Sequence, residues 1–455
     1  MQILHAQQAL TAAGWQDDIT ISIGSDGRIA AIGPIDQPPD TRVDLVLPAP
    51  VNLHSHSFQR AMAGLTERRG DDPTDSFWTW RKLMYRFLDQ LTPDHVEAIA
   101  AMVFVEMLEA GYGAVGEFHY LHHGPGGVAY DNPAELAARV ATAAGQAGIG
   151  LTLLPVLYHQ GGCDGRALGG GQQRFGNGPE AYARLHDASA RIISDGPSDW
   201  TIGVAPHSLR AVSPAALSDV VEMGANGPIH MHLAEQIAEV EDVQAHLGAR
   251  PAGWLLSNHD VDDRWCLIHA TQMTPQETAD LAKSGAVVGL CPITESNLGD
   301  GIFNGTAYLS KGGSFGVGSD SNVHIGLFEE LATLEYSQRL RDRSRAAMAL
   351  PGKSVGRTLF DRLAHGGSQA AGRDSGTLAV GQLADIVGLS TNNPWVCGRR
   401  GDTALDSLIF AGHGRDCITD VWSAGRHVVQ DGRHLKRDAV ERAFMATMAD
   451  LSGDL

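Results

Sequence analysis

The sequence predicts an α/β fold, a (β/α)8 TIM-like barrel with a small β-sandwich domain built from both chain ends. Two patterns indicate this fold. Short apolar runs alternate with stretches of helical length through the middle of the chain, whereas both ends alternate apolar with polar residues around turn signals. We expect residues 1–46 to form the N-terminal part of the sandwich, 47–374 the barrel, and 375–455 the rest of the sandwich with a terminal helix.

The two chain ends carry hairpin patterns. Residues 19–23 place isoleucine at every second position, and Asp-Gly at 26–27 supplies a turn before the next apolar run. The segment 418–435 repeats the pattern, with turn signals at 424–425 and 431–432. We therefore expect both ends to be β-structure.

Eight apolar runs supply the predicted barrel strands, and helix-like stretches such as 93–110 and 132–147 separate most of them. The runs are LVLPAPVNL (45–53), AVGEFHY (114–120), IGLTLLPVLY (149–158), TIGVAPHS (201–208), PIHMHL (228–233), WCLIHA (265–270), AVVGLCP (286–292) and FGVGSDS (315–321). Eight alternating βα units predict a closed parallel barrel, in which active sites lie at the carboxyl ends of the strands.

The formal net charge of −19 restricts the partners of the protein. Such an acidic surface argues against nucleic acid and against an anionic membrane, so a small anionic substrate would need a local basic pocket. The insertion after the first run, roughly 55–92, belongs to the catalytic face of a barrel. Its basic residues are Arg60, Arg68, Arg69, Arg81, Lys82 and Arg86.

The N-terminus, the length of the apolar stretches and the cysteines predict a cytoplasmic protein. The N-terminus has neither a basic region nor a sustained apolar core, and the longest apolar stretches are about half of a membrane span. The five cysteines are odd in number and form no CxxC pair, which is typical of reduced thiols.

Metal-competent residues follow four of the predicted strands. His54 and His56 are two residues apart and therefore lie on the same side of the pleat. Later strand ends supply further candidates, which are His232, Glu235, His269 and Asp320. Three imidazoles and a carboxylate suit Zn²⁺ or another divalent first-row ion.

Each of these signals is weak alone, because histidine pairs often serve as hydrogen-bonding residues and an Asp after Gly-Ser often forms a turn. Their convergence on one face predicts a metal site. His230 lies one pleat deeper and is interpreted as a core hydrogen-bonding group, and Cys266 and Cys291 as small core residues. None of the five lysines lies in the third or fourth run, so a bridging modified lysine is absent and one metal per chain is predicted.

Four short segments resemble the deaminase branch of the amidohydrolase superfamily, and they are HSH, HMHLAE, IHA and GSDS. The longer strings are similar to the formimidoylglutamate deiminase family, and they are HSHSFQRAMAGLTE (54–67), FWTWRKLMYRF (77–87), EFHYLHH (117–123) and GTLAVGQLADIV (376–387). The resemblance implies the metal ligands His54, His56, His232 and Asp320, the catalytic residues Glu235, His269 and Asp320, and the substrate contacts Gln59, Arg81, Tyr120, His207 and Arg210. It also implies a homodimer with one divalent metal, most simply Zn²⁺, in each chain.

The activity implied is hydrolysis of N-formimino-L-glutamate to N-formyl-L-glutamate and ammonia in histidine degradation. Asp320 would take the proton of the attacking water, His269 would orient it or stabilise charge, and Glu235 would protonate the imine nitrogen.

Three alternatives stay open. One is a deaminase of the same branch acting on a nucleobase or nucleoside, and another is cyclic-amide hydrolysis, which the missing lysine disfavours. The third is a non-catalytic barrel protein. A separate alternative for Arg81 and Arg210 is that they are ordinary solvated loop charges.

Overall fold

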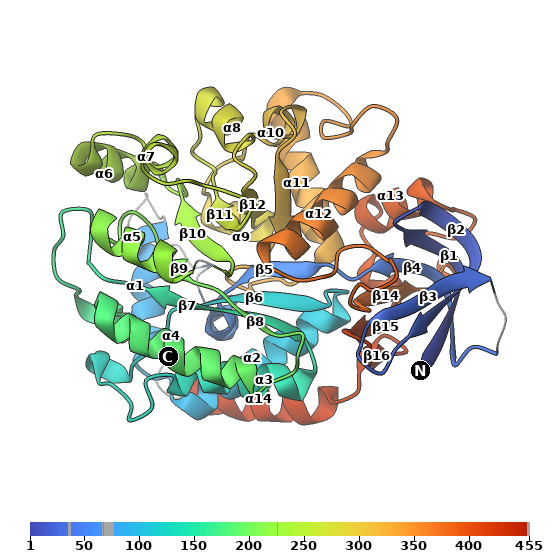
Figure 1. Cartoon of the computed structure of the whole chain (residues 1–455), viewed down its shortest axis with the longest axis horizontal. Helices are drawn as coiled ribbons and strands as arrows, with labels where there is room; N and C mark the ends of the chain where they lie inside the picture. The colour runs from blue at the N-terminus through green and yellow to red at the C-terminus, as the bar shows by residue number, and fades with distance from the viewer. Residues whose placement is uncertain (35–37, 66, 68–76, 225, 453–455) are drawn as a thin grey trace.

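The computed structural model describes residues 1–34, 38–65, 67, 77–224 and 226–452 (Figure 1). Within this part of the chain two parallel sheets occupy the middle of the molecule. The first has the order β5-β6-β7-β8, with β9 also paired to β7, and the second has the order β10-β11-β12-β13. Their strands are β5 (Val51–Ser55), β6 (Ala114–His119), β7 (Gly150–Leu157), β8 (Thr201–Ile202), β9 (Ala205–Pro206), β10 (Ile229–Leu233), β11 (Trp265–His269), β12 (Val287–Leu290) and β13 (Ser314–Val317).

Parallel bridges connect the two sheets at both edges. Val204 pairs with Ile229 on one side, and Ser55 pairs with Asp320 on the other. The strands from β5 to β13 therefore follow one another around a closed path, which we call the strand ring. The predicted succession of parallel strands is confirmed, except that the fourth predicted run, 201–208, is divided into the two short strands β8 and β9.

The first predicted run, 45–53, is wrong as a single strand. Its first half belongs to β4 (Thr41–Pro48), which pairs with β1 and β14 outside the strand ring, and only its second half belongs to β5. The physical reason is the Pro48-Ala49-Pro50 segment, because proline has no N–H to continue a ladder.

Helices surround the strand ring (Figure 1). The predicted helical stretches 93–110 and 132–147 are confirmed, since α2 (Pro93–Glu109) and α3 (Glu135–Ala147) occupy them. Thr92 caps α2 by accepting a hydrogen bond from the His95 backbone N–H, and Pro93 occupies the first turn. The other helices here are α1 (Phe77–Leu88), α4 (Pro179–Ser194), α5 (Pro214–Met223), α6 (Ile237–Leu247), α7 (Pro251–Asn258), α8 (Pro275–Leu281), α9 (Pro292–Leu298), α10 (Gly305–Ser310), α11 (Leu327–Asp342) and α12 (Val355–Ala370).

Four short 3₁₀ helices also lie among the described residues, and these are η1 (Ser57–Met62), η2 (Pro125–Gly127), η3 (Gly170–Arg174) and η4 (Arg415–Cys417). Two of the basic residues noted in the insertion after the first run, Arg68 and Arg69, fall outside the described residues. No described helix combines the length and the apolarity that crossing a bilayer requires.

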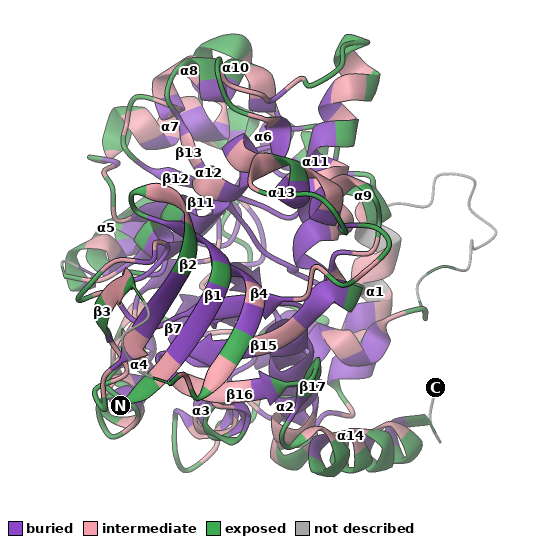
Figure 2. Ribbon diagram, turned by 90° about the vertical axis from the view of Figure 1, so that its right-hand side faces the viewer, coloured by how far each residue is buried: buried purple, intermediate pink, exposed green. Residues whose placement is uncertain are grey.

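The two chain ends form one continuous eight-stranded sheet, in the order β17-β16-β15-β14-β4-β1-β2-β3 (Figure 2). We expected two packed sheets; instead β14 adds to the edge of β4, so strands from both ends share a ladder. The hairpin turns at 26–27, 424–425 and 431–432 are confirmed. The remaining elements are β1 (Gln2–Thr11), β2 (Gly14–Ile23), β3 (Ile29–Pro34), β14 (Ile386–Leu389), β15 (Ile418–Ser423), β16 (Arg426–Gln430), β17 (Arg433–His434), α13 (Asp402–Phe410) and α14 (Arg437–Leu451).

Candidate active site

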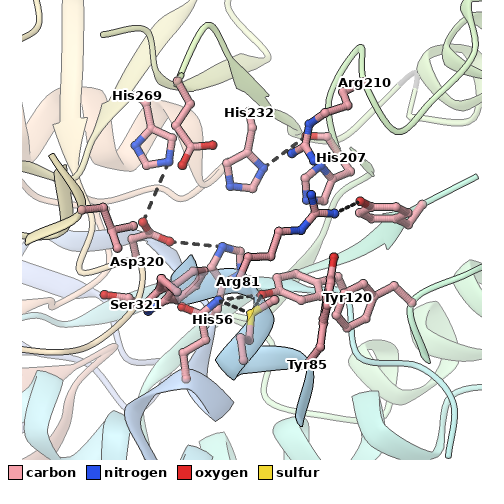
Figure 3. Close-up of a pocket in the computed structure, with 17 residues that line it drawn as sticks. His56, Arg81, Tyr85, Tyr120, His207, Arg210, His232, His269, Asp320 and Ser321 are labelled. Carbon is pink, nitrogen blue, oxygen red and sulfur yellow. Dashed lines mark hydrogen bonds and ion pairs between the residues drawn. The ribbon is translucent and has the colours of Figure 1, made fainter. Parts of the chain in front are cut away.

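A pocket lies at the carboxyl ends of the ring strands, and its space outside the protein atoms, with its open mouth counted, is about 550 Å³ (Figure 3). The candidate residues that line it are His56, Gln59, Arg81, Tyr120, His207, Arg210, His232, Glu235, His269 and Asp320. His54 lies beside them and is completely buried. The structure therefore brings all the predicted site residues together.

The imidazoles gather around the carboxylate of Asp320. Its Oδ1 lies 3.5 Å from His54 Nε2 and 3.2 Å from His56 Nε2. Candidate ligand atoms of His54, His56 and His232 all lie within 4.8 Å of one another. Ligand atoms held about 2.0–2.2 Å from one ion would be separated by roughly 3–4 Å. The three histidine side chains would therefore need to move only slightly closer together to bind one ion.

Backbone carbonyls fix the orientation of two of these rings. His56 Nδ1 lies 2.9 Å from the Phe118 carbonyl, and His232 Nδ1 lies 3.2 Å from the His207 carbonyl. A carbonyl only accepts, so each Nδ1 carries the hydrogen and each Nε2 presents a lone pair in the neutral ring. Both nitrogens of buried His54 lack a hydrogen-bond partner among the described residues. This donor set fits a divalent metal.

Electrostatics support the same protonation states. Burial, reinforced by the neighbouring imidazoles, lowers the pKa of His54 and of His232 well below the usual range, so both rings are neutral. Burial alone would raise the pKa of Asp320, but hydrogen bonding to His56 and the positive charge that His56 and His269 carry when protonated lower it below its ordinary value. A divalent cation bound to the neutral rings would supply positive charge at the same place. Neutral imidazoles beside an ionised carboxylate are suitable ligands for Zn²⁺.

Glu235 and His269 form an acid–base pair beside this cluster. Burial, together with Glu239 and Asp320, raises the pKa of Glu235 to about 7. Burial alone would lower the pKa of His269, but Glu235, Glu295 and Asp320 raise it to about 10. A carboxyl group that titrates near neutral pH can both accept and deliver a proton.

Left-handed backbone is concentrated at these strand ends. His269 has a φ of 70°, Asp320 of 47°, and Ala234 and Ala270 of 50° each. Such conformations cost non-glycine residues about 1–3 kcal/mol and occur often at functional sites. Backbone hydrogen bonds maintain them: Asp320 N–H donates to the His54 carbonyl at 2.9 Å, and His56 N–H donates to the Asp320 carbonyl at 2.9 Å.

The predicted substrate contacts lie around the histidine cluster, with the Tyr120 ring 4.7 Å from the His56 ring and the His207 ring 4.8 Å from the His232 ring between centroids (Figure 3). Gln59, in η1, donates to the Tyr120 hydroxyl at 2.6 Å, and its buried Oε1 has no partner among the described residues. Arg81, in α1, donates to the Tyr158 hydroxyl at 2.9 Å. Arg210 is only 8% exposed and lines the pocket, so it is not a solvated loop charge. Two guanidinium groups thus give an acidic protein a local basic pocket.

Several residues of the site were not singled out from the sequence, and they are Trp80, Met84, Tyr85, Tyr158, Phe175, Glu295, Leu298 and Ser321. Tyr158 and Ser321 end predicted strand runs, so the strand-end rule could have found them. The Oε1 of Glu295 lies 3.3 Å from His269 Nδ1 and also accepts a hydrogen bond from Cys291 N–H at the start of α9. In the sequence Glu295 could not be distinguished from an ordinary residue of the first helical turn.

The residues interpreted as structural lie inside the protein. His230 Nε2 lies 2.7 Å from the Ala370 carbonyl, and the ring is completely buried. Cys266 and Cys291 are also completely buried beside apolar side chains. The interpretations of His230 and Cys266 are confirmed, whereas the Cys291 sulfur also lies within 4.8 Å of ligand atoms of His269 and Glu295.

Comparison with known proteins gives consistent similarities along the chain. The profile of the amidohydrolase family matches residues 45–428, and that of the formimidoylglutamate deiminase HutF N-terminal domain matches residues 1–40. The formimidoylglutamate deiminase of Pseudomonas aeruginosa is 48% identical over 461 residues, which cover 99% of this chain and 100% of that protein. The 5-methylthioadenosine/S-adenosylhomocysteine deaminase of Bacillus cereus is 26% identical over 439 residues, covering 95% of this chain and 92% of the relative.

A crystal structure of an amidohydrolase from Brucella melitensis is 48% identical to this chain. It superposes with a TM-score of 0.95, covering 99% of this chain and 100% of that one. The terminal sheet and the strand ring are therefore found together in that solved structure.

Proposed function

The chain belongs to the amidohydrolase family, and from that membership we propose that it hydrolyses N-formimino-L-glutamate to N-formyl-L-glutamate and ammonia, a step of histidine degradation. The observation that carries the proposal is the similarity, over almost the entire chain, to a formimidoylglutamate deiminase. The two arginines of the pocket support it, because this substrate carries two carboxylates.

We propose that the strand ring is a (β/α)8 barrel of the TIM type. The bridges at both sheet edges and the similarity to the Brucella melitensis structure support this description. A homodimer in the cytoplasm remains a prediction, and sedimentation of the purified protein would test the dimer.

His54, His56, His232 and Asp320 are the proposed ligands of one Zn²⁺ ion. When bound, the ion would supply Lewis-acid activation of water, whose pKa can fall toward about 7 at such sites. The orphaned nitrogens of His54 and the carbonyl-oriented rings of His56 and His232 support this ligand set.

We assign proton transfer to Asp320, which is also a proposed metal ligand, and to Glu235. Asp320 accepts the proton of the attacking water, and Glu235 delivers a proton to the imine nitrogen. As the tetrahedral intermediate breaks down, its hydroxyl group loses its proton to Glu235 and its amino group gains the proton held by Asp320, so that ammonia leaves and both residues return to their starting states. His269, held by Glu295, lies with its Nε2 3.9 Å from Asp320 Oδ2, where it orients the attacking water or stabilises the charge that develops on the reacting group. These steps need Glu235 to change its protonation state, which its raised pKa favours.

We assign binding of the anionic substrate to five polar residues that line the pocket. Arg81 and Arg210 are the proposed carboxylate partners, and Gln59, Tyr120 and His207 supply further polar contacts. Exclusion of water by the aromatic lining strengthens such ion pairs.

A nucleoside or nucleobase deaminase is the second candidate, because aromatic side chains line the pocket and the Bacillus cereus relative is such a deaminase. Ammonia release from a panel of formimino amino acids, nucleobases and nucleosides distinguishes the two. We expect the highest kcat/KM with N-formimino-L-glutamate. Faster turnover of a neutral ring compound would promote the second candidate, and no turnover of any compound would favour a non-catalytic protein.

A further inference from the structure

The hydroxyl group of Tyr158, directly after β7, has hydrogen-bond roles that its partners determine. It lies 2.9 Å from Arg81 Nη2 and 3.1 Å from Gln172 Nε2. A guanidinium group has no acceptor atom, so Tyr158 accepts the bond from Arg81. Gln172 Oε1 accepts from Gly169 N–H at 3.1 Å, which fixes the orientation of the amide and leaves its NH₂ group facing Tyr158.

The hydroxyl hydrogen of Tyr158 is therefore used in neither bond. Tyr158 is 2% exposed and lines the pocket, and it donates to no acceptor in the described part of the chain. A buried donor without an acceptor is destabilising, so a ligand that supplies one gains affinity there. Because Arg81 contacts the same hydroxyl, the acceptor that fits best is an anion.

We propose that Tyr158 donates this hydrogen to the side-chain carboxylate of the substrate, beside Arg81, and that Tyr158 thereby selects substrates that carry this second carboxylate. The inference rests on the proposed function. It adds a residue that the similarity of the motifs did not indicate.

Position within the pocket distinguishes the two carboxylates. The ring centroids of His54 and His232 are 4.8 Å apart, those of His232 and His207 4.8 Å, and those of His207 and Tyr158 4.6 Å. The ring contacts of Tyr158 in the described part of the chain are with Phe175 and His207 and not with a proposed metal ligand. The α-carboxylate is close to the formimino carbon along the bonds of the substrate, whereas the side-chain carboxylate is farther away and can reach Tyr158.

The first test compares two substrates. We expect Tyr158→Phe to lower kcat/KM for N-formimino-L-glutamate by about 10- to 100-fold, as the loss of a hydrogen bond to a charged group predicts. N-Formimino-L-glutamine lacks the charge, and the loss on it should be below about 3-fold. Tyr182→Phe is the matched control, because its buried hydroxyl bonds the Pro155 carbonyl of the same strand and lies outside the pocket lining.

The second test separates direct contact from positioning of Arg81. In an Arg81→Met background, Tyr158→Phe should still lower kcat/KM for N-formimino-L-glutamate by about 5-fold or more, since the direct bond survives the loss of Arg81. No further loss in that background would mean that Tyr158 acts only through Arg81, and equal losses on both substrates would mean a structural role. Either result overturns the inference while the proposed function stands. A parent protein that does not turn over N-formimino-L-glutamate overturns both.

Discussion

Two clusters of buried charge lie at opposite ends of the strand ring, and they differ in how completely their polar atoms are paired. At the amino end, Arg373 donates to Asp199 and Asp385 over distances of 2.6 to 3.0 Å. Arg426 adds bonds of 2.7 and 2.8 Å to the Asp199 carboxylate. This cluster packs against Gly150, where a Cβ would lie 2.6 Å from the Arg373 guanidinium.

The cluster at the carboxyl end is incompletely paired. Both ring nitrogens of His54, one carboxylate oxygen of Glu239 and one of Asp300 are buried without a hydrogen-bond partner among the described residues. The left-handed residues of the strand ring also lie at this end. The polar atoms of the amino-end cluster bond to one another and join the strand ring to the terminal sheet. The carboxyl-end cluster keeps polar atoms available for a ligand, as the proposed metal and substrate would require.

The largest effect expected on the carboxyl-end cluster is that of His54→Ala. Elemental analysis should show that the metal content falls from about one divalent ion per chain to nearly none. Activity should fall by at least about 10³-fold, because water activation is lost. In metal-free protein the loss in the free energy of unfolding should be limited to the packing of the buried ring, because both ring nitrogens lack a hydrogen-bond partner among the described residues. Two tightly bound ions in the parent would contradict the single-metal site.

The amino-end cluster should give the opposite result. Arg373→Met leaves Asp199 and Asp385 buried with fewer partners, and chemical denaturation should show a loss of about 3–5 kcal/mol. The kcat of the remaining folded protein should change by less than about 2-fold, because the cluster lies away from the pocket. Arg28→Met is the control: the Arg28–Asp374 pair is exposed and worth only about 0.2–1 kcal/mol.

Within the carboxyl-end cluster, Glu235→Gln separates proton transfer from metal binding. We expect kcat to fall by about 10²-fold or more while the metal content remains that of the parent. Glutamine keeps the shape of the side chain but cannot deliver a proton. A raised KM with unchanged kcat would instead identify Glu235 as a binding residue.

The smallest effect expected is an acid dependence of stability at the amino end. Burial would raise the pKa of Asp199, but the Arg426 hydrogen bond and the charges of Arg373 and Arg426 hold it below its ordinary value of 3.8. A group with a lowered folded-state pKa contributes stability above its unfolded value and loses it as pH falls further. The free energy of unfolding of Asp199→Asn should therefore fall less steeply below about pH 4 than that of the parent. Identical slopes would show that Asp199 is not stabilised by ionisation.

The carboxyl-end cluster was largely predictable from the sequence. Parallel strands end on one face, and side chains of a strand alternate with period two, so His54, His56 and His232 could be placed together without a structure. Their assigned roles remain predictions. Tyr158 also follows a predicted strand, but tyrosine is common in cores and its free hydrogen is visible only once Arg81 and Gln172 are in place.

The amino-end cluster was not predictable. Arg373, Asp199 and Arg426 come from a loop after α12, a loop before β8 and the first residue of β16, and no local pattern links them. The division of β4 from β5 was also missed, since the apolar run continues through Pro48 and Pro50. An apolar run predicts that its residues are buried, but it does not indicate to which of two sheets each part of the run belongs.

The closure of the strand ring beside the proposed metal ligands has a consequence for the order of folding. Asn52 and Ser319 exchange hydrogen bonds of 2.7 and 3.0 Å across a separation of 267 residues, directly beside His54 and Asp320. Contacts between such distant residues carry a large loop-closure entropy and form slowly. During synthesis His54, His56 and His232 emerge long before Asp320, so the nascent chain can offer at most an open set of imidazoles. The complete site therefore forms only when the first and last strands of the ring meet.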